Sequence, residues 1–273
     1  MANEIVKYNN ELNLFPLKDF TEYDLNFLMA ICAKMKDLGE ELQVFEYKQL
    51  MELIEWDASK SIMVFHKDLM RMAEKLRHVG GTLETVEDDV FVSFNLFTTF
   101  EGSRKNRTLK VRVNPQFKYI LNDLSKNFTR FELKEYVKLE GKYSKLLYQN
   151  LKQYRKTGWW QVSVDDLRSA LSIPESVPTR NILTKLISPS LEIIRTCKGF
   201  SDLEVEVLRS DRRGRAVIGY KFKFTPDNQI KGQMSIEDYQ KTTAKRKKKK
   251  DQTTNFEQRN YDYDELEKLL VDN

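Results

Sequence analysis

Cysteine and histidine are nearly absent from this chain. Its 273 residues include two cysteines, Cys32 and Cys197, and two histidines, His66 and His78. Their positions match no Cys/His zinc spacing, and the cysteines lie in apolar segments far apart along the chain, which argues against a disulfide framework. Such sparing use of cysteine is typical of the reducing cytoplasm, where we expect this protein to reside.

Glycine is also scarce, and none of the 10 glycines falls in the Gly-x-x-x-x-Gly-Lys-Ser/Thr pattern that cradles phosphates. No Gly-x-Ser-x-Gly nucleophile elbow is present. The chain has 12 tyrosines, but a nucleophilic tyrosine needs a base or a metal beside it, and no such partner can be named. We therefore expect a binding protein and not an enzyme, without a catalytic residue, metal or cofactor.

Long apolar runs are missing too. No stretch approaches the roughly 18 apolar residues of a membrane span, because polar residues bound the segment 27–33 and interrupt the segment 91–100. The first residues, MANEIVKYNNE, lack the apolar core of a secretory signal. Hydrophobic residues still make up 40% of the chain, which is enough for compact cores. The length suits two domains of about 100–130 residues and a tail, with no membrane partner.

The net charge of +5 is modest but unevenly distributed. Residues 241–250 carry seven positive side chains and no acid, whereas residues 251–273 carry seven acids against two cations. Such blocks repel themselves and bury little surface, so we expect a flexible tail over 227–273. The basic run is either a solvated linker or a non-specific contact with DNA phosphates, and the sequence leaves both open.

Hydrophobic periodicity predicts one succession of elements twice: a helix, a short strand, two helices and a β-hairpin with an arginine-rich tip. The first copy has helices at 21–39, 48–54 and 60–77, a strand at 42–47, and hairpin strands at 90–94 and 109–113. The second has helices at 143–156 and 163–171, a helical segment at 179–194 that we expect to kink at Pro189, a strand at 159–162, and hairpin strands at 203–208 and 216–224.

This order is that of a winged helix. We predict an α+β fold of two tandem winged-helix domains with β-hairpin wings, at residues 1–125 and 126–226, followed by the disordered basic tail at 227–273.

A winged helix binds DNA with its last helix in the major groove and its hairpin on the neighbouring backbone or minor groove. The candidate reading residues of the first copy are Ser59, Lys60, His66, Lys67 and Arg71. Those of the second copy are Thr179, Arg180, Asn181, Thr184 and Lys185. The hairpin tips add Arg104, Lys105 and Arg107 in the first copy and Arg209, Arg212, Arg213 and Arg215 in the second. A single cation on an outer helix face is usually just solvated, and His66 is more typical of a packing or phosphate-side residue than of a catalyst. DNA binding is favoured because both copies combine a basic last helix with a basic hairpin tip.

The second copy resembles a known family. Residues 146–158, LLYQNLKQYRKTG, are similar to the LYxxLKxYRKTG helix of the plasmid replication initiators of the Rep_3 superfamily. Further likenesses are residues 164–171, 183–194 and the strand 219–224, and the resemblance spans about residues 5–226. One departure is Ile187-Ser188-Pro189, where the family often has Leu-Asp-Pro.

The resemblance implies a protein that binds directly repeated sequences (iterons) in double-stranded plasmid origin DNA and promotes origin opening. It implies recruitment of a host helicase or its loader, no catalytic centre, and repression of the protein's own promoter. It also implies monomers on iterons and homodimers in their absence, with the first domain serving dimerisation and DNA contact and the second serving as the main iteron-binding domain.

The tail carries a weaker likeness, to the C-terminal ends of DnaD-like replication proteins. Its apolar positions lie on one stripe of an amphipathic helix, at Tyr263, Leu266, Leu269 and Leu270. We expect this stripe to bind a host replication protein, and the alternative is a frayed terminus.

Three other functions are compared with the initiator. A sequence-specific winged-helix transcription regulator would share every feature except origin opening. A DnaD-like coupling protein would bind DNA with little sequence preference, whereas an initiator distinguishes its repeats. A relaxase or primase needs acids or histidines that converge on a metal, and the one Asp-x-Asp pair, Asp262 and Asp264, lies in the tail.

Overall fold

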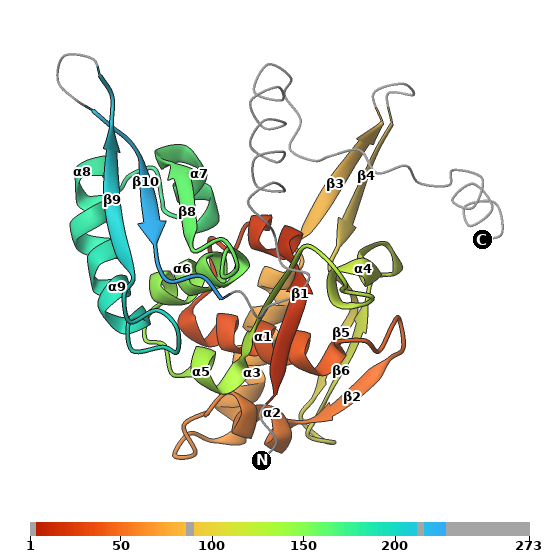
Figure 1. Cartoon of the computed structure of the whole chain (residues 1–273). Coiled ribbons are helices and arrows are strands. Elements are labelled where there is room, and N and C mark those ends of the chain that lie inside the picture. The colour runs from red at the N-terminus through yellow and green to blue at the C-terminus, as the bar shows by residue number, and fades with distance from the viewer. Residues whose placement is uncertain (1–3, 86–89, 212–215, 228–273) are drawn as a thin grey trace.

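A computed structural model describes residues 4–85, 90–211 and 216–227 (Figure 1). Two of its sheets have three strands each, in corresponding order. One contains β2 (Gln43–Glu46), β6 (Thr108–Val113) and β5 (Phe97–Ser103), in the order β2-β6-β5. The other contains β8 (Trp159–Ser163), β10 (Val217–Lys223) and β9 (Glu204–Arg209), in the order β8-β10-β9.

In both sheets the strand before the helix pair is hydrogen-bonded to the last strand of the hairpin. This topology is that of a winged helix, and the predicted α+β fold of two such units is confirmed.

The first unit contains α1 (Glu22–Met35), α2 (Tyr47–Leu53) and α3 (Ile62–Leu76). Thr21 caps α1, because its hydroxyl accepts from the Asp24 amide while the Asp24 carboxylate accepts from the Thr21 amide at 2.7 Å. Most of α1 is buried, so it serves as the central helix of the molecule (Figure 1).

The second unit contains α6 (Lys142–Gln153), α7 (Val164–Ala170), α8 (Thr179–Ile182) and α9 (Ser188–Ile194). A π-helical turn, Leu183–Ile187, joins α8 to α9, so helical structure is continuous across 179–194. The wider π-helical turn lies directly before Pro189, and such turns are among the usual sites of helix kinks, so the kink expected there stays a prediction.

The predicted pairing of the first hairpin is wrong. β6 pairs with β5, while β4 (Val90–Asn95) pairs with β3 (Gly80–Thr85) in a separate two-stranded sheet. Gly80 and Gly81, which follow α3 closely, begin β3. Alternation of apolar residues reveals that a segment is a strand but not which strand it pairs with. The β3–β4 hairpin is thus inserted between α3 and the wing, and in Figure 1 it projects on the same side of the molecule as β9–β10.

A two-stranded ribbon joins the two units. β1 (Ile5–Asn9) pairs with β7 (Phe128–Glu132), with Val6 opposite Phe131, and neither strand was predicted. Val6, Tyr8 and Phe131 of the ribbon belong to one hydrophobic core that includes both units. The ribbon crosses the division predicted at 125/126, and that division remains a prediction.

The remaining elements are short and connect these parts. They are the 3-10 turns η1 (Asn10–Leu14) and η2 (Pro115–Phe117) and the helices α4 (Lys118–Leu121) and α5 (Leu133–Val137). Both cysteines are free and buried. Across the described ranges, no helix has both the length and the apolar character needed to cross a bilayer.

Candidate nucleic-acid interface

The helix-turn-helix of the second unit is held together by Arg168 on α7. Its guanidinium donates to the carbonyl oxygens of Pro174 at 3.0 Å and Val177 at 2.6 Å, and to the Thr179 hydroxyl at 3.3 Å. These bonds join α7 to the turn and to the first residue of α8. Arg168 therefore fixes the direction in which α8 leaves the turn, a role that was not predicted from the sequence.

The outer face of α8 and the following π-helical turn is polar. Arg180, Thr184 and Lys185 are exposed, and Asn181 is half-buried. Thr179 is half-buried and accepts the bond from Arg168, so it helps to position the helix. Four of the five predicted reading residues of this unit thus lie on one short, accessible segment.

The wing of the second unit is the β9–β10 hairpin. Arg209 ends β9 and is exposed, and the Ser210 amide donates to the Ala216 carbonyl at 2.9 Å. The other predicted cations of this tip, Arg212, Arg213 and Arg215, lie outside the described residues.

In the first unit the reading helix begins later than predicted. α3 starts at Ile62, so Ser59 and Lys60 lie in the turn before it. The Asp57 carboxylate accepts from the Ser59 hydroxyl at 2.6 Å and from its amide at 3.0 Å, and these bonds lower the pKa of Asp57. The Lys60 ammonium lies 5.4 Å and 5.3 Å from the ring centres of Tyr23 and Trp56. Both residues shape the entry to α3.

His66 packs against the neighbouring elements of its unit, and its contact with DNA stays a prediction. Its Nδ1 is hydrogen-bonded to the hydroxyl of Tyr47 at 2.7 Å, and its side chain is half-buried. It also lies close to Gly102 of β5, where an added Cβ would be 3.6 Å from the imidazole. His66 thus connects α3 to α2 and the wing, as its place in the amphipathic pattern suggested.

Two of the predicted cations of α3 lie on its solvent face. Lys67 and Arg71 are exposed, and Arg71 forms an ion pair with Asp68 one turn away. Large apolar side chains are exposed beside them, since Met63, Val64 and Met70 are 49%, 39% and 59% exposed. The face therefore combines charge with apolar surface, unlike the polar face of α8.

The wing tip of the first unit is anchored beside its helix-turn-helix. Arg104, Lys105 and Arg107 are all exposed. Arg107 has a left-handed backbone (φ 55°), and its carbonyl accepts from the Tyr47 amide at the start of α2 at 2.8 Å. The backbone bond places three cations next to the α2–α3 pair.

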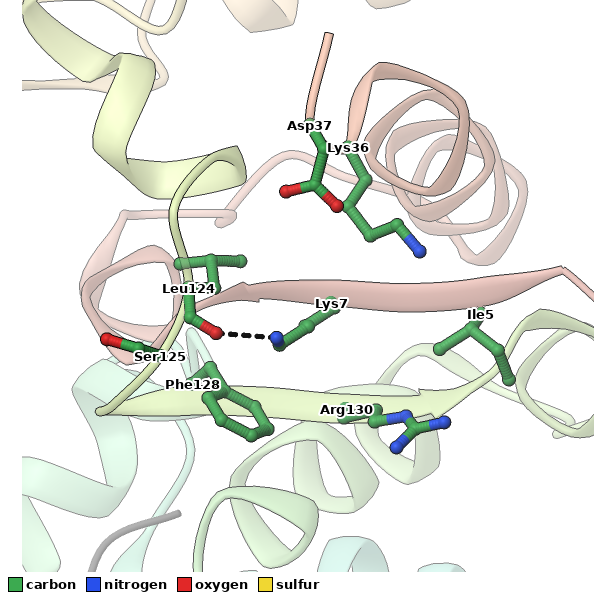
Figure 2. Close-up of a pocket in the computed structure, with 8 residues that line it drawn as sticks. All are labelled: Ile5, Lys7, Lys36, Asp37, Leu124, Ser125, Phe128 and Arg130. Atoms are coloured by element: carbon green, nitrogen blue, oxygen red, sulfur yellow. Dashed lines mark hydrogen bonds between the residues drawn. The ribbon is translucent and has the colours of Figure 1, made fainter. Parts of the chain in front are cut away.

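A further basic hollow was not predicted. Figure 2 shows it beside the β1–β7 ribbon, with Lys7, Lys36 and Arg130 together with Asp37 around a cavity of about 470 Å³. The Lys7 ammonium donates to the Leu124 carbonyl at 2.5 Å, and its burial lowers its pKa. Lys7 and Arg130 lie directly opposite each other in the ribbon. Alternation alone could not find this hollow, because its residues come from three distant segments.

The residues of the LYxxLKxYRKTG motif support the fold. Tyr148 and Lys152 of α6 both bond to the Glu135 carboxylate. Arg155 donates to the Thr225 carbonyl, and its guanidinium lies 5.2 Å from the ring centre of Phe200. These two motif cations are therefore bonded to other residues of the protein. Among the residues that the structure describes, no three His, Cys, Asp or Glu side chains gather as a metal would require.

Comparison with known proteins gives agreement in sequence and in structure. The family described as "Initiator Replication protein, WH1" matches residues 5–152, and "Initiator Rep protein, WH2" matches residues 163–224. A probable replication protein Rep of Bifidobacterium longum is 32% identical over 226 residues, which are 82% of this chain and 73% of that protein.

The crystal structure of the Pi initiator protein in complex with iteron DNA superimposes with a TM-score of 0.62 at 16% identity, covering 84% of this chain and all of that one. This likeness shows the fold. The two winged-helix units, the matches to both halves and the similarity over most of the chain show that the chain belongs to the family of plasmid replication initiator proteins.

Proposed function

We propose that this replication initiator binds iterons in double-stranded origin DNA with both winged-helix units at once. The observation that carries the proposal is the repeated geometry: each unit presents a helix with exposed cations beside a wing that carries exposed cations. The core shared by the two units holds these surfaces in a fixed relation. Two helices held at a fixed separation read two parts of one site. A repeated origin sequence of defined length provides two such parts at a constant spacing.

The two kinds of surface have different tasks. Arg180 and Asn181 have the donors and acceptors that pair with guanine and adenine edges, so the α8 face specifies sequence. Arg104, Lys105 and Arg107 at the first wing tip, and Arg209 at the second, contact phosphates and position the protein without reading bases. Lys67 and Arg71 flank the α3 face as further phosphate contacts.

Several steps after binding form part of the proposal. Bound initiators promote origin opening, recruit a host helicase or its loader, and repress their own promoter. They bind iterons as monomers and form homodimers in their absence. The apolar stripe Tyr263, Leu266, Leu269 and Leu270, outside the described residues, binds the host replication protein. Deletion of residues 251–273 should then reduce plasmid maintenance while leaving iteron binding intact, and unchanged maintenance would remove this role.

A binding titration against the DNA that flanks the protein's own gene tests the proposal. Arg180→Ala should cost about 1–3 kcal/mol on the cognate repeat and relax base preference, because it removes a base contact and leaves the phosphate contacts. The triple variant Arg104→Gln, Lys105→Gln, Arg107→Gln should weaken cognate and random DNA alike. It should also flatten the dependence of log K on log salt by about one for each phosphate that the variant no longer neutralises.

The matched control is Lys138→Gln, an exposed lysine away from both reading helices and both wings. It should change neither preference nor salt slope. Equal affinity of the unaltered protein for repeats and random DNA would contradict the proposal and favour the coupling-protein alternative. Specific binding without strand opening of a supercoiled origin plasmid would favour the transcription regulator.

A further inference from the structure

The solvent face of α3 is unusual for a helix that faces DNA. Met63, Val64 and Met70 expose about half of their side chains on it. Val64 and Met70 line a shallow hollow of about 470 Å³ together with Lys67, Asp68 and Arg71. Single exposed apolar residues are ordinary, but three on one helix face indicate a surface that contacts an apolar group of a partner.

The surroundings of this face point to DNA as the partner. Lys67 and Arg71 are interleaved with the apolar side chains, and the wing cations Arg104, Lys105 and Arg107 belong to the same unit. A polyanion is therefore the occupant that the charges select. α3 also holds the same topological place as the α8–α9 segment, after the shorter helix and before the hairpin of its unit.

The base edges in the major groove offer one apolar group, the 5-methyl group of thymine. We infer that α3 reads its part of the iteron by packing Met63, Val64 and Met70 against thymine methyl groups. The part of the site under the first unit is then rich in A·T pairs, whereas the part under the second unit is read by hydrogen bonds from Arg180, Asn181 and Thr184. This inference rests on the proposed function and adds to it the chemistry of one half-site.

Methionine suits this task. Its unbranched, polarisable side chain adapts to irregular surfaces, so Met63 and Met70 can follow the stepped positions of successive methyl groups. Lys67 and Arg71 on the same face reach the phosphates at the groove edges, which holds the apolar side chains against the bases. The apolar side chains thereby meet methyl groups and the cations meet phosphates, while Asp68 pairs with Arg71 inside the face.

Replacement of thymine by uracil in the DNA removes the methyl group and leaves every hydrogen-bonding atom in place. The full-length protein is first footprinted on its origin repeat to locate the two half-sites. Uracil is then introduced into one half-site at a time, and affinity is measured by fluorescence anisotropy. Substitution under the first unit should weaken binding by about fourfold for each methyl group that α3 touches. Substitution under the second unit should change affinity less than twofold.

Variants connect the effect to α3. Met70→Ala and Met63→Ala, made singly, keep a good helix former at an exposed position and should fold normally. Each should bind the thymine site more weakly and lose part of the difference between thymine and uracil. The control Leu14→Ala removes an apolar side chain that is 53% exposed at the end of η1, outside both wings, and should keep the full difference.

The possible failures are distinguishable. The inference is overturned if uracil under the first unit leaves affinity unchanged, or if the Met70→Ala variant keeps the whole uracil effect. The proposed function stands in both cases. Sedimentation could also show a dimer that the Met63→Ala and Met70→Ala variants dissociate, with no uracil effect. This result would assign the face to a second copy of the chain and would also overturn the inference. No specific binding of the unaltered protein to origin DNA would defeat the proposed function itself.

Discussion

At the scale of single residues, the helix-turn-helix of the second unit depends on Arg168. It is half-buried and donates to two carbonyls of the 174–177 turn and to the hydroxyl of Thr179. Arg168 lies in a family motif beside other charged residues. The local sequence therefore does not distinguish it from a solvated cation. Its function follows from three acceptors that meet only in the folded chain.

Arg168→Met should therefore destabilise the protein by about 2–3 kcal/mol, because charge-assisted hydrogen bonds disappear and carbonyls of the turn are left without their donor. Urea denaturation measures this change in the free energy of unfolding. DNA affinity at a temperature where the variant is folded should also fall, because α8 is no longer fixed at its start. The nearby exposed Asp165→Asn is the control, and equal stability of the two variants would show that the turn does not need the arginine.

At the scale of elements, the turn from α6 into β8 explains the glycine of the YRKTG motif. Gly158 has φ +75°, and an added Cβ would be 2.8 Å from the Phe224 carbonyl oxygen and 2.9 Å from Pro226. The chain that leaves β10 thus passes directly over this residue. Only glycine allows both the left-handed conformation and the close approach.

Gly158→Ala should cost more than the left-handed backbone alone, which is about 1–2 kcal/mol. Gly39→Ala provides a matched control, since Gly39 has φ +66° and no atom within 4 Å of the position of an added Cβ. Thermal denaturation of both variants separates the two contributions. Equal destabilisation would mean that the contact with Phe224 and Pro226 relaxes without cost.

At the scale of the whole molecule, the two winged helices are not independent bodies. β1 pairs with β7, the Asn13 amide donates to the Gln153 side chain at 2.9 Å, and the Leu17 amide donates to Ser172 at 3.3 Å. The N-terminal segment thus contacts residues more than 100 positions away. A single core that includes both units holds the two reading helices in a fixed relation.

A fragment of residues 1–125 should consequently fail to fold, whereas residues 1–157 should fold alone. The shorter fragment lacks β7 and α6, and their removal uncovers the buried side of α1 and leaves β1 without a partner. Circular dichroism with urea denaturation tests both fragments. A cooperative transition of the shorter fragment at the same midpoint as the longer one would show that the boundary at 125/126 separates real folding units.

Sequence periodicity was sufficient for the order of elements in the second unit, but it missed β3 and β5 in the first unit and both strands of the ribbon. The helices of both units, the second hairpin and the exposed cations Lys67, Arg180 and Lys185 follow from local pattern, because amphipathic spacing decides which side of a helix meets solvent. Pattern could not supply the bond of His66 to Tyr47, or the position of Ser59 and Lys60 before α3. These features depend on which residues the fold brings next to each other.

The amino-acid sequence by itself thus determined the family, the two winged-helix units and the absence of nucleotide-loop and nucleophile-elbow motifs, since these depend on residue type and spacing along the chain. Only the tertiary structure decided the partners of the strands at 80–113, the ribbon that joins the units, the turn held by Arg168 and the apolar face of α3. Strand pairing, the partners of buried acceptors and exposed area all depend on contacts between distant segments. The free energy of these contacts is gained only when the whole chain folds.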